Sequence, residues 1–187
     1  MILAVDVQYA PQDEWARTGG IVFKSWDASE AAAEFVTILD EVSPYESGAF
    51  YKRELPCLLP LIEHALSRFS IETIVVDSFV TLARGAPGLG QHLHTQLGRE
   101  IEVVGVAKNG FEGATATQIT RGISRKPLWV SSTHDHTAAA ACVASMAGDS
   151  RIPLLLKRTD ALARATVSPI DSAIEVAADS ETRIPKL

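Results

Sequence analysis

Two apolar runs, each carrying one aspartate, constrain the fold of this chain more than any other feature. The run over residues 2–9 is interrupted by Asp6, and the run over residues 71–77 ends in Asp77. Short continuous apolar runs rich in β-branched residues are typical of central strands that are buried on both faces. A carboxylate in such a strand is costly unless a cation or several donors compensate it. We therefore predict two central strands whose aspartates serve a polar site.

The remaining apolar patterns predict a mixed α/β sheet flanked by helices. Gly19-Gly20 should lead into a second strand that pairs with the first as an antiparallel hairpin, and the first three strands should form a meander. The strand, helix, strand order between residues 71 and 107 indicates a parallel crossover. The state of residues 28–35 is left open. The other predicted strands are 21–26, a strand near 36–42, 101–107 and 128–131, and the predicted helices are 53–69, 89–97, 136–146 and 160–164.

The chain should form one domain. It has 187 residues, enough to bury one sizeable core, and it contains no internal repeat, low-complexity tract or linker. We expect the domain to cover residues 1–165, with residues 166–187 as a weakly patterned C-terminal tail.

The charge distribution bears on possible partners. A formal net charge of -6 argues weakly against generic nucleic-acid binding. The acidity is mostly N-terminal, however: residues 1–50 hold nine acidic and two basic side chains, whereas residues 51–187 hold fourteen acidic and fifteen basic ones. Several basic residues of this second part could form a local phosphate-binding face or an ordinary solvated surface. They are Lys52, Arg53, Arg84, Lys108, Arg121, Arg125 and Lys126.

The sequence favours a cytoplasmic protein without a membrane segment. It shows no signal-peptide pattern and no apolar stretch near the roughly 20 residues that span a bilayer. Cys57 and Cys142 lack metal-binding spacing and are expected as buried reduced thiols. The histidines likewise lack a transition-metal pattern.

Three carboxylates are candidates for one metal site. The helix predicted from residue 53 begins beside Glu54, and Asp6 and Asp77 lie on strands that could be neighbours. An oxygen-rich site of this kind suits Mg²⁺, which can polarise a phosphoryl oxygen and generate hydroxide for phosphodiester hydrolysis. The alternative is that each acid caps a strand end or pairs with an arginine.

Residues 44–56, Pro-Tyr-Glu-Ser-Gly-Ala-Phe-Tyr-Lys-Arg-Glu-Leu-Pro, resemble the signature segment of the endonuclease V family. Residues 5–9, 75–77 and 105–108 resemble the family's two aspartate strands and its lysine strand, in the family's order. Weaker similarities include His94, residues 130–134, and the Arg-Ile-Pro of residues 151–153, which brings Asp160 onto a family position near the metal.

This resemblance covers about residues 1–164 and implies an RNase H-like fold with a DNA repair activity. It implies cleavage near deaminated purines, chiefly deoxyinosine in DNA, or inosine in RNA for some members. Asp6, Glu54 and Asp77 would hold Mg²⁺, with Mn²⁺ as a substitute, and Lys108 would contact the scissile phosphate or position water. The protein would act as a monomer.

The substrate-binding residues implied by the resemblance are Tyr45, Gly48, Arg53 and His94. Tyr45 would form part of a wedge that fills the space left by a flipped base. Backbone amides near Gly48 and in the loop of residues 85–90 would read that base.

Two departures from the family pattern leave the target open. Asp77 is followed by Ser-Phe-Val-Thr-Leu-Ala-Arg in place of Gly-x-Gly and His-Pro, and Glu46-Ser47 replaces the usual Ile-Pro. The alternatives are a nucleic-acid-binding homologue that has lost cleavage and an RNase H-like nuclease with a different DNA or RNA target.

Overall fold

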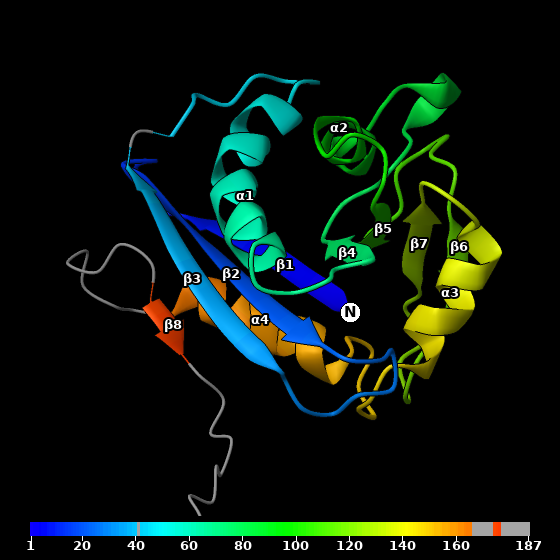
Figure 1. Ribbon diagram of the computed structural model, residues 1–187. Helices are drawn as coiled ribbons and strands as arrows, with labels where there is room; N and C mark the ends of the chain where they lie inside the picture. Colours follow the sequence, from blue (N-terminus) through cyan, green and yellow to red (C-terminus); the bar gives the residue numbers. More distant parts are fainter. Residues whose placement is uncertain (41, 166–173, 177–187) are drawn as a thin grey trace, which may run out of the picture.

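An antiparallel meander forms the first half of the sheet (Figure 1). The computed structural model describes residues 1–40, 42–165 and 174–176. Parallel strands continue the sheet beside the first strand, and two antiparallel strands complete its other side, in the order β6-β7-β5-β4-β1-β2-β3-β8. The strands are β1 (Ile2–Tyr9), β2 (Trp15–Phe23), β3 (Ala33–Asp40), β4 (Thr73–Val76), β5 (Glu102–Ala107), β6 (Thr117–Ile119), β7 (Leu128–Ser132) and β8 (Ile174–Val176).

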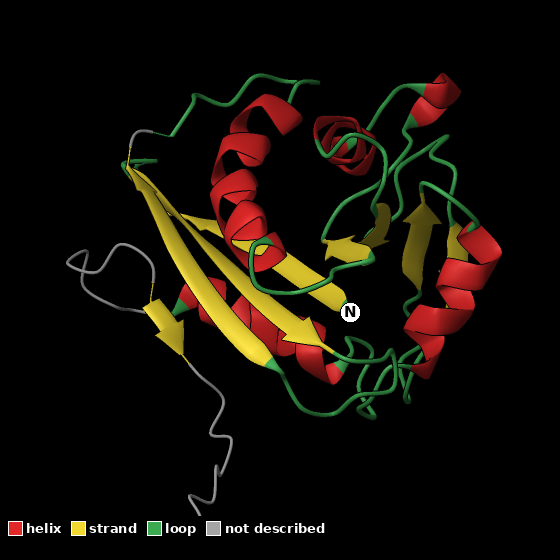
Figure 2. Ribbon diagram, in the orientation of Figure 1, coloured by secondary structure: helices red, strands yellow, loops and turns green. Residues whose placement is uncertain are grey.

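Helices cover both faces of this sheet (Figure 2). One apolar core joins odd-numbered β1 residues such as Leu3 and Val5 to α1 (Tyr51–Leu66) and α2 (Leu89–Gln96). A second core joins even-numbered β1 residues to α3 (His136–Ser145) and α4 (Leu154–Arg164). The two cores follow from the period of two along a strand, which sends successive side chains to opposite faces. The predicted α/β class with an RNase H-like mixed sheet is confirmed.

The predicted position of the second strand was wrong. β2 begins at Trp15, so Gly19 and Gly20 lie inside the strand and do not precede it. A Cβ on Gly19 would lie 2.7 Å from the backbone nitrogen of Ala163 in α4, and one on Gly20 would lie 2.4 Å from Leu61 Cδ2 in α1. The two glycines therefore allow helices to pack closely on both faces of β2, a tertiary requirement that overrides their local preference for turns.

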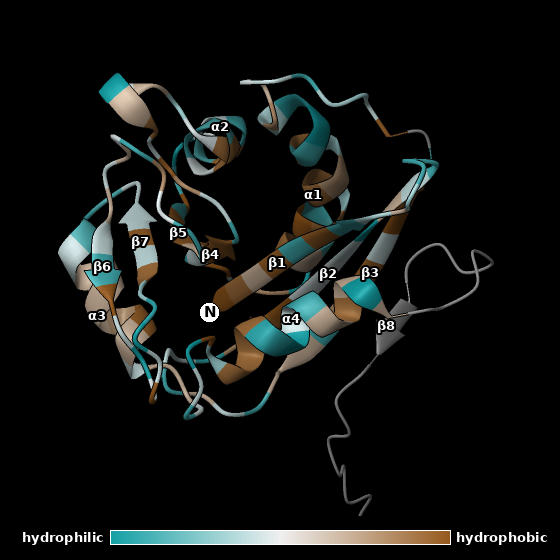
Figure 3. Cartoon of the chain, turned by 180° about the vertical axis from the view of Figure 1, so that it is seen from behind, coloured by the Kyte–Doolittle hydropathy of each residue, from teal (hydrophilic) through white to brown (hydrophobic). Residues whose placement is uncertain are grey.

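Other boundaries shifted as well. α4 begins at Leu154, six residues before the predicted start at Asp160, and β6 was not predicted. α1 begins at Tyr51, two residues before the predicted start at residue 53. Figure 3 shows α4 lying across β1 and β2, with hydrophilic and hydrophobic stretches alternating along it. This alternation is expected of a helix with one face on a sheet.

The C-terminal part of the chain is described only where it joins the sheet. β8 pairs antiparallel with β3, with Phe35 opposite Glu175. The predicted tail otherwise falls on residues 166–173 and 177–187, outside the described residues, and the boundary at residue 165 stays a prediction. Among the described helices, none is both long and apolar enough to cross a membrane.

Candidate active site

Parallel pairing places Asp6 and Asp77 side by side. Val5 pairs with Val76, so the aspartates that follow them leave adjacent strands at the same level. Parallel strands end at the same edge of a sheet, and the strand period directs both side chains toward the face covered by α4. This confirms that β1 and β4 are neighbours, as the metal-site prediction required.

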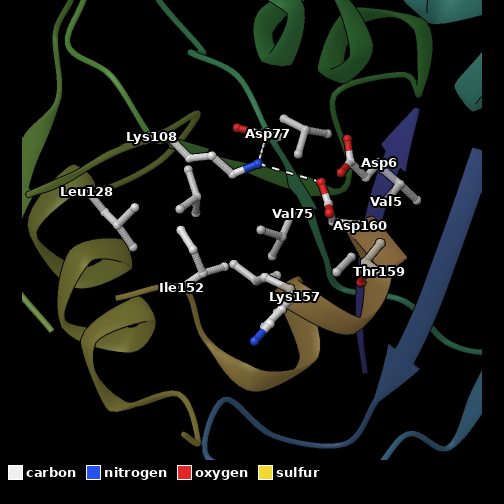
Figure 4. Close-up of a pocket in the computed structure, with 14 residues that line it drawn as sticks. Val5, Asp6, Val75, Asp77, Lys108, Leu128, Ile152, Lys157, Thr159 and Asp160 are labelled. Atoms are coloured by element: carbon white, nitrogen blue, oxygen red, sulfur yellow. Dashed lines mark hydrogen bonds and ion pairs between the residues drawn. The ribbon is translucent and has the colours of Figure 1, made fainter. Parts of the chain in front are cut away.

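Lys108 reaches the same edge from the end of β5. Its Nζ lies 2.6 Å from Asp77 Oδ2 and 3.8 Å from Asp160 Oδ1 on α4 (Figure 4). Asp160 also accepts a hydrogen bond of 2.8 Å from Arg164 Nε, one helical turn further along α4. Two basic and three acidic side chains therefore meet where β1, β4, β5 and α4 converge.

A small cavity of about 100 Å³ opens beneath these charged groups. Aliphatic side chains from the sheet and α4 form most of its wall, and Figure 4 shows Asp6, Asp77, Lys108 and Asp160 together at one end of it. Its lining includes Ala4, Val5, Asp6, Val75, Val76, Asp77, Val106, Lys108, Leu128, Ile152, Leu156, Lys157, Thr159 and Asp160.

Glu54 approaches from the opposite face. It lies in the first turn of α1 and is buried. Tyr9, at the end of β1, donates a hydrogen bond of 3.3 Å from its hydroxyl to Glu54 Oε2. Burial raises the pKa of Glu54 to about 8, with a further contribution from the negative charge of Asp6. The two carboxylates therefore lie within electrostatic reach of each other, around the end of β1.

The basic side chains of the site do not fully compensate the negative charge that its acidic groups would carry if all were ionised. Burial, together with the negative charges of Asp77 and Asp160, raises the pKa of Asp6 to about 7. Burial lowers the pKa of Lys108, but its hydrogen bond and charge interactions with Asp77, together with the charges of Asp6 and Asp160, outweigh this effect and raise it overall. Lys108 thus remains a cation at neutral pH, and the raised carboxyl pKa values indicate room for further positive charge.

The donor set suits a hard divalent cation. Asp6, Asp77 and Glu54 offer carboxylate oxygens, the ligands that Mg²⁺ and Mn²⁺ prefer, and their excess negative charge favours a cation. Within the described part of the chain, no three His, Cys, Asp or Glu side chains are arranged to hold a metal ion as they stand. The residues fit the chemistry of the ion, and closer convergence of their oxygens would be needed to coordinate it.

Two predicted substrate-binding residues, His94 and Arg53, are buried. His94 is buried in α2, and its Nδ1 lies 2.8 Å from the carbonyl oxygen of Ile101, before the start of β5. Lys108 follows the other end of that strand, so the structure does not bring His94 to the carboxylates. Arg53 is 7% exposed and donates two hydrogen bonds to Asp13, which leaves little of its guanidinium for a substrate.

Two of the basic residues predicted to flank the site, Arg121 and Lys52, have partners within the protein. Arg121 is buried and donates to the backbone carbonyls of Ala144, Met146, Gly148 and Ser150 around the end of α3. Lys52 pairs with Glu46 at 2.8 Å.

The predicted wedge is exposed, ahead of α1. Tyr45 is 64% exposed, and its ring centroid lies 6.5 Å from that of Phe50, which is also exposed. Gly48 between them has a φ of +80°, a conformation that glycine adopts without strain. This segment therefore presents two aromatic rings to solvent.

Backbone hydrogen bonds constrain the loop after Asp77. The amides of residues 85–90 were predicted to read a flipped base. Gly88 N donates to the carbonyl of Val80 at 2.8 Å, and Gly90 N donates to that of Phe79 at 3.2 Å. These two amides are occupied within the loop, so base reading by this loop would depend on its other groups.

Three polar residues around the site were not assigned roles from the sequence. They are Tyr9, Asp13 and Arg164, whereas the family resemblance had already placed Asp160 near the metal. Asp160 and Arg164 both lie in the helix predicted over residues 160–164, and their four-residue spacing is a signal for the ion pair that the prediction did not use. Tyr9 and Asp13 reach Glu54 and Arg53 across the fold, and no local pattern reveals such contacts.

A family model of endonuclease V matches residues 1–152. The catalytic domain of human endonuclease V superposes with a TM-score of 0.74 at 22% identity, over 87% of this chain and 80% of that one. Endonuclease V from Streptomyces avermitilis gives a TM-score of 0.67 at 27% identity, over 87% and 79% of the chains.

A relative with bound DNA has also been crystallised. Endonuclease V of Ciona intestinalis, in complex with a 23mer DNA containing an inosine followed by a ribo-adenosine, gives a TM-score of 0.72 at 17% identity, over 87% and 83% of the chains. No curated protein matches the sequence of this chain.

Proposed function

Because this chain belongs to the endonuclease V family, we propose that it is a metal-dependent endonuclease that cleaves DNA near deaminated bases, chiefly deoxyinosine, in DNA repair. The observation that carries the proposal is the meeting of Asp6, Asp77 and Lys108 at one edge of the sheet. Acids and a lysine placed together in this way suit phosphodiester hydrolysis and have no obvious structural purpose.

Asp6, Asp77 and Glu54 would hold the metal ion. When bound, Mg²⁺ supplies Lewis-acid polarisation of the phosphate and lowers the pKa of a water molecule. The three acids come from β1, the end of β4 and α1, so rigid elements carry them, and rigid elements place functional groups more accurately than loops do.

Lys108 would bind a non-bridging oxygen of the scissile phosphate. Its ammonium group already lies among the carboxylates, and Asp77 and Asp160 restrict where it points. A positive charge held beside the phosphate would stabilise the negative charge that develops during hydrolysis.

The exposed aromatic pair would serve as the wedge. Tyr45 and Phe50 lie in the segment that precedes Glu54, so a nucleic acid that meets the carboxylates could also meet these rings. An aromatic side chain inserted into the stack offsets part of the cost of extruding a base. The charge of Glu46 is offset by Lys52, which reduces its repulsion of the DNA backbone.

Cleavage of end-labelled oligonucleotides tests the proposal. Single-stranded and duplex DNA, with and without one deoxyinosine, and an inosine-containing RNA would be incubated with the protein in Mg²⁺ and in EDTA. We expect metal-dependent cutting near deoxyinosine and its loss in Asp77→Asn. Binding without cutting of any strand would show a nucleic-acid-binding homologue, and equal cutting of unmodified strands would show a different target.

A further inference from the structure

Tyr9 hydrogen-bonds to Glu54, which lies in the first turn of α1. The hydroxyl of Tyr9 is 3.3 Å from Glu54 Oε2, and Tyr9 lies three residues after Asp6 on β1. Glu54 is otherwise a buried acid on a helix that packs through aliphatic side chains. The Tyr9 hydroxyl donates a hydrogen bond that directs this carboxylate.

Arg53 holds Tyr9 in turn. The carbon of its guanidinium group lies 3.8 Å from the centroid of the Tyr9 ring, a cation–π contact. Asp13 fixes the other edge of the guanidinium with two hydrogen bonds of 2.9 and 2.5 Å. Arginine suits this position because its planar fork can stack on a ring and pair with a carboxylate at once.

Asp13 reaches Arg53 from the turn between β1 and β2. Its φ is +59°, a left-handed conformation that is uncommon for residues other than glycine. Asp13 N also donates to the carbonyl of Ala10 at 3.0 Å, which closes the turn. A turn residue in this conformation, with its carboxylate fully used by one arginine, indicates that the turn is built to make this contact.

We propose that Asp13, Arg53 and Tyr9 are positioning residues that act in series to hold the Glu54 carboxylate in place for a divalent cation. This inference rests on the proposed function of Glu54. It also reassigns Arg53, which the sequence suggested as a substrate-binding residue, to an internal role. Asp13 and Arg53 act through Tyr9. The effect of substituting either of them on Glu54 should therefore not add to the effect of substituting Tyr9.

Mn²⁺ binding measures this role without cleavage. The free ion would be quantified by electron paramagnetic resonance during titration of the metal-free protein. Tyr9→Phe, which keeps the ring under Arg53 and removes the hydroxyl, should weaken Mn²⁺ binding about fivefold, the factor expected for one hydrogen bond. Arg53→Lys and Asp13→Asn should weaken it in the same direction.

A double-mutant cycle separates a series from independent effects. If the residues act in series, Tyr9→Phe combined with Asp13→Asn should bind Mn²⁺ no more weakly than Tyr9→Phe alone. Tyr51→Phe and Asp27→Asn are matched controls, on α1 and in the turn after β2, and should bind Mn²⁺ like the wild type. Asp13 is nearly half exposed, so its variant tests the series even if Tyr9→Phe folds poorly.

The outcomes distinguish this inference from the proposed function. Unchanged Mn²⁺ binding in the folded Tyr9→Phe and Asp13→Asn variants, or fully additive losses, would overturn the series. Weakened, non-additive binding in a protein that cuts no strand would support the series and overturn the nuclease proposal. In an active protein, the variants should regain most of kcat at high metal concentration while KM for DNA stays unchanged.

Discussion

Lys108 Nζ lies 2.6 Å from Asp77 Oδ2, although 31 residues and a helix separate the two in the sequence. The contact joins the ends of β4 and β5, which pair in parallel. Both side chains are more than one-third exposed, and ion pairs with this exposure contribute little to stability. The position of the pair beside Asp6 therefore points to a role in chemistry more than in folding.

Lys108→Met should separate activity from stability. We expect kcat for a deoxyinosine substrate to fall by about 100-fold, because a preorganised charge at the phosphate is lost. The free energy of unfolding should change by less than about 1 kcal/mol. Single-turnover cleavage and urea denaturation measure the two quantities.

Lys157→Met is the matched control for that experiment. Lys157 lines the same cavity, but Figure 4 shows its amino group pointing away from the carboxylates. Its variant should retain activity within about twofold of wild type. Equal losses in both variants would mean that general charge, and not the placement of Lys108, supports cleavage.

The pH dependence of stability should reveal the raised carboxyl pKa values. Asp6 and Glu54 titrate near 7 and 8 in the folded protein, against 3.8 and 4.5 for unperturbed groups. Folded pKa values above the unfolded ones stabilise the protein fully below about pH 4, and this contribution is lost as pH rises toward 8. The metal-free protein should therefore lose stability between pH 5 and pH 8.

Asp6→Asn should flatten that profile. At pH 8 it should be more stable than wild type, on the order of 2 kcal/mol, because a buried negative charge has been removed. Urea denaturation in EDTA at several pH values measures this, with Asp27→Asn as a control in an exposed turn. A wild-type profile that is flat from pH 5 to pH 8 would contradict the assigned pKa values.

Gly19→Ala and Gly20→Ala should differ in cost. A Cβ on Gly19 would meet backbone atoms of α4, at 2.7 Å from Ala163 N and 2.8 Å from Thr159 O, so the helix that carries Asp160 must shift. We expect a loss of about 3 kcal/mol. At Gly20 the nearest atom belongs to the Leu61 side chain, which can rotate, and the loss should be about 1 kcal/mol. Thermal unfolding compares the two, and equal losses would show that α4 yields as readily as a side chain.

Tyr45→Ala should weaken recognition without weakening the fold. Its ring is 64% exposed, so the free energy of unfolding should change by less than about 0.5 kcal/mol. Cleavage at deoxyinosine should fall at least about tenfold, because the wedge offsets part of the unstacking cost. Ile123→Ala, at an apolar side chain that is even more exposed, is the control. Unchanged cleavage by Tyr45→Ala would remove the wedge from the proposed mechanism.

Local patterns were enough to predict most of the strands, most of the helices and the fold class. The apolar runs around Asp6 and before Asp77 form buried strands because their period and β-branched content have few other solutions. The same runs identified the acids themselves, since a carboxylate in an apolar strand is conspicuous without any knowledge of its neighbours.

Tertiary structure decided what these residues contact. Gly19 and Gly20 look like a turn in the sequence, and only the helices on both faces of β2 explain why they lie inside a strand. Arg53 looks available for phosphate until Asp13 and Tyr9 are seen to enclose it. Hydrophobic periodicity is a property of neighbouring residues, whereas charge pairing and close packing join segments far apart in the chain. The sequence by itself therefore determined which groups are buried and charged, and the packing of the sheet and helices decided which of them act together.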